Sequence, residues 1–161
     1  MSVDLPVIGR DLIPESQFVS CRRTVMDANP GMPEEMAGRI VEEGLKFVAA
    51  CSNNPGVGLA PSRVVDEGWH ALLLHTAVYA ELCDRLGGGF VHHFPGYDPT
   101  NYDPDILDRT RRAIADVGYV ADAELWGEPS AETLFTVAAR CQHAPECTIV
   151  IIPKPKPKPK G

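Results

Sequence analysis

The chain has 161 residues, of which 44% are hydrophobic and 23% are charged, and this length and composition suit one domain that buries most of its apolar surface. Its formal net charge is −7, yet four of its 15 basic residues, Lys154, Lys156, Lys158 and Lys160, lie within the last eight positions. The chain before these lysines therefore contains 11 basic and 22 acidic side chains. Such an acidic body repels phosphate backbones, which argues against nucleic acid as its principal partner.

The sequence shows no targeting or membrane segment. Its first residues, MSVDLPVIGRDLIPES, lack a basic lead followed by a long apolar stretch, and no apolar run approaches the roughly 20 residues that cross a bilayer. We therefore expect a soluble, cytoplasmic protein. The five cysteines are odd in number and mostly far apart, so we expect reduced thiols rather than a disulfide framework.

Two helices are predicted in the first third of the chain. Residues 1–14 are expected to form a flexible lead, and residues 15–28 a first helix that the NPGMP turn ends. Pro33 suits the first turn of a second helix, because proline lacks only a donor that has no partner there. Apolar residues at helical spacing carry this helix to about Cys51.

The longest predicted helix spans residues 62–86. Ser62 is a good N-cap, and glycines 87–89 end the helix because glycine tolerates the left-handed conformation. The stretch FVHHFPGYDPTNYDP then predicts a long loop, followed by a helix over residues 104–117 and a shorter one over residues 130–140.

The carboxyl end changes composition sharply. TIVII at residues 148–152 is the one strand-like stretch, and PKPKPKPKG follows it closely. Alternating proline blocks helix and sheet pairing, so this segment is expected to be an extended polyproline II rod. The sequence thus predicts an all-α, compact single-domain bundle of four to five helices over residues 15–147, with an extended tail over residues 148–161.

The two histidines of VVDEGWHALLLHT point different ways on the predicted helix. At 100° per residue, Asp66, Glu67 and His70 share the polar side, whereas His75 lies about 140° away within the apolar arc. The two histidines therefore cannot bind one ion together. We interpret His75 as a core imidazole that is hydrogen-bonded to a neighbouring turn.

His70 is the candidate metal ligand of this helix. Asp66 and Glu67 precede it by four and three residues, so either carboxylate can reach its side of the helix. His92 and His93 follow the glycine stop on a loop that can fold back, and one of the pair is expected to reach the site. A solvated charged face with a loop histidine pair is the alternative.

Asp66, His70 and His93, with Glu67 or a water molecule, would form a mixed nitrogen and oxygen set that suits zinc, iron or manganese. With an open coordination position, Glu67 would be the available general base for a metal-bound water. A second candidate site, Cys141, His143 and Cys147, resembles half of a zinc site but lacks a matching half. The sequence has no nucleotide-binding or zinc-protease motif.

The segment VVDEGWHALLLHTAVYAELCDRLGGGFVHH resembles the glycine-rich-domain-containing protein-like family. The resemblance runs from residue 65 to residue 93, extends back through NPGMPEEMAGRIVEEGLKFVAACSNNPG, and implies an all-helical domain. The positions that match the family's pattern are Asp66, Trp69, His70, Tyr79, Cys83 and His93. The glycine-rich region that names the family is absent from this chain, and the resemblance implies no activity.

Two functions remain open from the sequence. The first is a small domain that binds one divalent metal, zinc or iron, through Asp66, His70 and His93, with or without catalysis. The second is an adaptor in which the acidic body packs with a partner protein and the Lys-Pro tail docks on an aromatic groove or an anionic surface. The sequence does not distinguish oligomeric states.

Overall fold

The computed structural model of the chain describes residues 4–93 and 103–127. Its elements are the 3-10 helix η1 (Gly9–Leu12) and the helices α1 (Glu15–Ala28), α2 (Glu34–Asn53), α3 (Arg63–Leu74), α4 (Thr76–Leu86), α5 (Ile106–Asp116) and α6 (Ala123–Trp126). The described part contains no strand, which confirms the predicted all-α fold. No helix in these ranges is long and apolar enough to cross a membrane.

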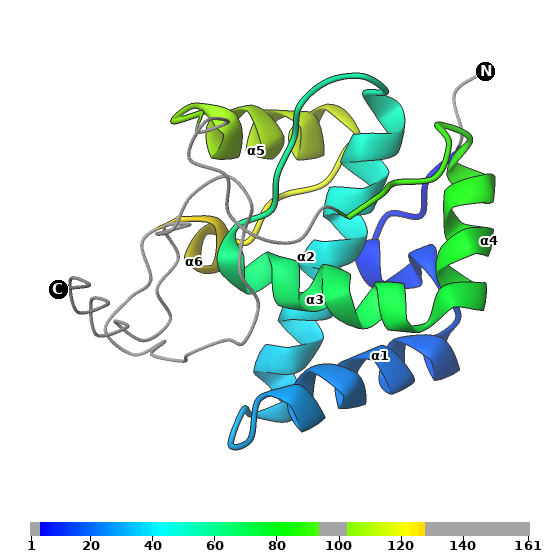
Figure 1. Ribbon diagram of the computed structural model, residues 1–161, viewed down its shortest axis with the longest axis vertical. Helices are drawn as coiled ribbons and strands as arrows, with labels where there is room; N and C mark the ends of the chain where they lie inside the picture. Colours follow the sequence, from blue (N-terminus) through cyan, green and yellow to red (C-terminus); the bar gives the residue numbers. More distant parts are fainter. Residues whose placement is uncertain (1–3, 94–102, 128–161) are drawn as a thin grey trace, which may run out of the picture.

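Helix α2 is the centre of the fold. Figure 1 shows it crossing behind α3, with α1 near one of its ends and α5 near the other. It packs against η1, α1, α3, α4 and α5. Ile40, Val41, Leu45 and Val48, which repeat at helical spacing, are all fully buried. The apolar stripe read from the sequence is therefore the core side of this helix.

The amino-terminal lead is more ordered than the sequence predicted. We expected residues 1–14 to be flexible, but η1 forms within them, and Leu12 and Ile13 are only 2% and 3% exposed. These two side chains join the hydrophobic core, and their burial holds the segment in place. Arg85 of α4 also donates a hydrogen bond to the Leu12 carbonyl.

The predicted long helix over residues 62–86 is wrong, because the chain breaks at His75 into α3 and α4. His75 has φ −91° and ψ 65°, outside the helical region, and it caps both helices. The break turns α4 so that Tyr79, Leu82 and Cys83 are buried, while Leu74 at the corner stays 73% exposed. Figure 1 shows the two helices running in clearly different directions.

His75 itself is half-buried rather than a core residue. Its Nε2 lies 2.9 Å from the Thr24 hydroxyl of α1. His75 is therefore hydrogen-bonded and separate from the candidate metal ligands, as the sequence predicted. The partner is a helix side chain, however, and not a neighbouring turn.

The carboxyl-terminal helices close one side of the bundle. The predicted helix over residues 104–117 corresponds to α5, whereas the one-turn helix α6 was not predicted. Trp126 of α6 is buried and donates from Nε1 to Glu43 Oε2 of α2. Four features predicted from the sequence lie outside the described residues. They are the helix over residues 130–140, the TIVII stretch, the Lys-Pro tail, and the group of Cys141, His143 and Cys147.

Candidate metal centre

The first turn of α3 places a carboxylate at the centre of the candidate site. The Ser62 hydroxyl accepts a hydrogen bond from the Val65 N–H, which confirms the predicted N-cap. One turn of helix separates Asp66 from His70, so both side chains lie on the same side of α3. Asp66 is 2% exposed and Glu67 is 5% exposed. The alternative of a solvated charged face is therefore wrong for these two carboxylates.

A glycine turn brings the second half of the site back to α3. Gly87 ends α4 with φ 81°, in the left-handed region. A Cβ at Gly88 would lie 1.9 Å from the Ser52 carbonyl oxygen, so only glycine fits beside the end of α2 there. The Gly88 N–H also donates to the Ser52 hydroxyl. The chain is thereby fastened to α2 and then runs toward His93.

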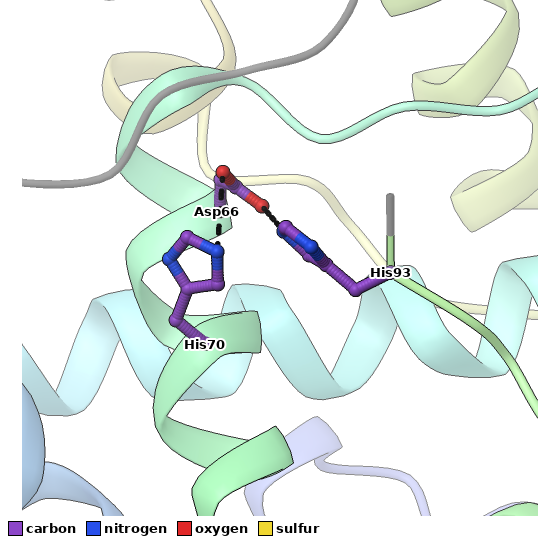
Figure 2. A group of neighbouring side chains, drawn as sticks. All are labelled: Asp66, His70 and His93. Atoms are coloured by element: carbon purple, nitrogen blue, oxygen red, sulfur yellow. Dashed lines mark hydrogen bonds and ion pairs between the residues drawn. The ribbon is translucent and has the colours of Figure 1, made fainter. Parts of the chain in front are cut away.

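Asp66 lies between two imidazoles, as Figure 2 shows. Its Oδ1 is 2.9 Å from His93 Nε2, and its Oδ2 is 3.9 Å from His70 Nε2. The two histidine rings are 4.3 Å apart at their centroids. One ligand atom from each of the three residues lies within 4.8 Å of the others. The structure therefore brings one carboxylate and two imidazoles together in a group that could hold a metal ion.

One oxygen of this group lacks a partner. Asp66 Oδ2 is fully buried and makes no hydrogen bond, and His70 Nε2 is too far away to donate one. It is the one side-chain oxygen or nitrogen in this condition among the described residues. A buried oxygen without a partner is costly, so this atom is the oxygen of the group that is available to bind a cation.

The other two proposed site residues lie elsewhere. His92 is exposed, and its ring packs 4.8 Å from the Phe90 ring, so it does not join Asp66 as a ligand. Glu67 turns toward the end of α1, where its Oε1 accepts a hydrogen bond from Asn29 Nδ2 at 2.9 Å. The interpretation of Glu67 as general base or as a fourth ligand therefore has no support in this geometry.

A buried polar chain positions the segment that carries His93. Trp69 of α3 donates from Nε1 to the Tyr79 hydroxyl at 3.0 Å, and that hydroxyl donates to the Val91 carbonyl. The Trp69 ring also packs against His93, with centroids 4.6 Å apart. Burial raises the pKa of Tyr79 above its ordinary value, so its hydroxyl stays a donor. From the sequence, Trp69 and Tyr79 were identified only as positions that match the pattern of the resembled family.

A cleft of about 460 Å³ opens beside the candidate centre, and nothing in the sequence pointed to it. It lies between the turn of residues 54–61 and the segment after Gly88, and Asp66 and His93 line it. Trp69 also contributes to its wall. The candidate ion-binding group thus borders a space large enough for a small molecule.

Cys51 of α2 lines the same cleft but is not poised for chemistry. Burial and the neighbouring Cys83 raise the pKa of its thiol to about 12, whereas the thiolate is the reactive and metal-binding form. Cys21, Cys51 and Cys83 are free thiols, as expected. Cys51 therefore carries little thiolate at neutral pH.

Comparison with known proteins places the chain in a family and corrects the resemblance drawn from the sequence. A family model described as UCP032817-like matches residues 11–100, more than half of the chain. The glycine-rich family does not match, so that assignment is wrong. No curated protein and no solved structure matches the chain. The matched range contains Asp66, His70 and His93.

Proposed function

We propose that this chain, which belongs to the UCP032817-like family, binds one divalent transition-metal ion through Asp66, His70 and His93. The observation that carries the proposal is the fully buried Asp66 Oδ2, which has no hydrogen-bond donor. A cation at this position would neutralise the carboxylate and occupy the free oxygen at the same time.

The donor set suits such an ion better than it suits calcium or magnesium. Neutral imidazole nitrogen favours zinc, copper, iron and nickel, whereas calcium and magnesium prefer oxygen ligands. A carboxylate with two imidazoles occurs in catalytic zinc sites and in non-haem iron sites. Zinc and iron are therefore the ions we propose first.

The spacing of the three side chains requires only a small adjustment. Two ligand atoms that each lie about 2.0 to 2.2 Å from one ion are at most about 4.4 Å apart. The atoms of this group lie within 4.8 Å of one another. His70 is 35% exposed in its side chain, compared with 10% for His93. His70 is consequently the ligand that is free to move by a few tenths of an ångström.

The proposal is tested by metal analysis of protein that is expressed without a histidine tag. We expect about one zinc or iron atom per chain, and loss of that atom in His70→Ala and His93→Ala. His92→Ala and His75→Ala are matched controls, because they remove imidazoles that lie away from Asp66. Metal-free wild-type protein that takes up neither ion from a chelator-buffered solution would contradict the proposal.

A further inference from the structure

We propose that the cleft beside the metal centre binds a small monocarboxylic acid with an aromatic or branched apolar body, its carboxylate on the ion. This inference rests on the proposed function, because the ion supplies the group that the carboxylate would bind. It adds the chemical class of the ligand.

The first argument is that the ion would keep a free position toward the cleft. Three protein ligands leave at least one coordination position open on zinc or iron. Asp66 and His93 line the cleft directly, so the ion between them lies at its edge. A ligand in the cleft would therefore reach the ion without displacing a protein side chain.

The second argument is charge. A divalent ion and the Asp66 carboxylate together leave one positive charge, since imidazole is neutral when it binds a metal. No lysine or arginine lines the cleft among the described residues. One carboxylate on the ligand balances this centre, and a second would be buried without a counter-charge.

The third argument is the character of the remaining walls. The other lining residues are mostly apolar and include Phe47, Leu59, Trp69 and Phe90. The volume of about 460 Å³ falls in the usual range for small-molecule sites, roughly 300 to 1,000 Å³. An apolar body of aromatic size would gain affinity from burial against these side chains.

The test compares four probes on protein loaded with Co²⁺, whose visible absorption reports changes at the ion. Phenylacetate carries both proposed features, and acetate lacks the apolar body. Phenylacetamide lacks the charge, and 4-carboxyphenylacetate places a second charge at the apolar end. We expect phenylacetate to bind at least about tenfold more tightly than each of the other three, and to bind only when Co²⁺ is present.

Two variants locate the binding in the cleft. Leu59→Trp and, at the rim, Val57→Trp reduce the space available, and we expect both to weaken phenylacetate binding while Co²⁺ affinity is retained. Leu74→Trp is the matched control, because Leu74 is 73% exposed at the corner between α3 and α4. Unchanged phenylacetate affinity in both cleft variants would overturn the inference.

The outcomes separate this inference from the proposed function. If the protein binds one Co²⁺ through its two histidines but binds phenylacetate no better than acetate, the ligand class is wrong and the metal centre stands. If no Co²⁺ binds, both proposals fall together.

Discussion

Asp66 has two carboxylate oxygens in different surroundings. Oδ1 is hydrogen-bonded to His93, whereas Oδ2 is buried and has no hydrogen bond. In the metal-free protein this second oxygen is a cost to folding, because a buried acceptor without a donor forfeits its interaction with water. Asp66 therefore costs the fold some stability, and it lies beside two imidazoles that could bind an ion. This combination indicates that Asp66 is kept for binding rather than for the stability of the fold.

The first prediction follows from that cost. Asp66→Asn keeps an oxygen for His93 but removes the buried charge, so we expect the free energy of unfolding of the metal-free protein to rise by about 1 kcal/mol. The same change should abolish metal binding. Urea unfolding in the presence of a chelator measures the first effect. Glu67→Gln is the matched control. Its amide oxygen can still accept the hydrogen bond from Asn29, but that bond loses the charge that strengthens it, so we expect no gain in stability.

The sequence allowed part of this site to be predicted. Helical periodicity is enough to place Asp66 and His70 one turn apart on one side of α3. It could not show which of His92 and His93 turns inward, because that choice depends on how Gly88 and Tyr79 fasten the segment. The sequence also could not show that Glu67 accepts a hydrogen bond from Asn29, because the two residues are 38 positions apart in the chain.

At the scale of helices, the crossing of α2 and α3 depends on two glycines. A Cβ on Gly68 would lie 2.2 Å from the Ile40 carbonyl oxygen, and one on Gly44 would lie 2.9 Å from the Gly68 backbone. The two backbones therefore meet without intervening side chains. This close approach sets the position of Asp66 and His70 above the core.

The second prediction concerns that crossing. Gly68→Ala must push α3 away from α2, and we expect it to lower the free energy of unfolding by about 3 kcal/mol or to prevent folding. Gly38→Ala is the matched control within α2, because the atom nearest to its added Cβ is 3.6 Å away on the Arg22 side chain. That change should stabilise the protein by up to about 1 kcal/mol. Thermal unfolding compares the two, and equal effects would contradict the close-contact argument.

Helix α6 is held to α2 by a buried carboxylate. Glu43 is 2% exposed, accepts from Trp126 Nε1 at 2.7 Å, and pairs with Lys46 at 2.5 Å. Burial raises the pKa of Glu43 above its ordinary value, although Lys46 and Trp126 act in the opposite direction. Glu43 is therefore the residue through which pH acts on this contact.

The third prediction gives the sign of that effect. Above the ordinary glutamate pKa of about 4.3, the unfolded chain loses the Glu43 proton while the folded protein still holds it. The contribution of Glu43 to the free energy of unfolding is therefore largest below that pH, and it decreases as pH rises toward the raised pKa. Relative to Glu43→Gln, the wild-type protein should lose stability as pH rises from about 4 toward the raised pKa of Glu43. Urea midpoints measure the difference, and a constant difference across this range would contradict the assignment.

The helices were predicted more successfully than the corner between two of them. Prolines, the Ser62 cap and glycines 87–89 mark most helix ends locally. No proline or glycine marks the break at His75, where burial of Tyr79 against the core and the Thr24 contact decide the direction of α4. Local patterns could not supply that information, because the deciding contacts join residues about 50 positions apart.

At the scale of the whole molecule, one described domain carries the core, the three side chains and the cleft. The family match over residues 11–100 takes in the end of η1 and all of α1, α2, α3 and α4, and with them every side chain of the proposed ion site. Helices α5 and α6 lie outside that match and pack on the same core through Ile114 and Trp126. The proposed site therefore lies entirely within the segment that the family model matches.

The last prediction treats the ion as a ligand of the folded state. Asp66 and His70 come from α3 and His93 from the segment after α4, so unfolding separates the three side chains and releases the ion. At a free ion concentration about 100 times the dissociation constant, folding gains about 2.7 kcal/mol. For a chain of this size that corresponds to a rise in Tm of roughly 5 to 10 °C. Calorimetry with a zinc titration measures it. His93→Ala should show no such rise, while His92→Ala should show the full rise, because only the first of these removes a partner of Asp66.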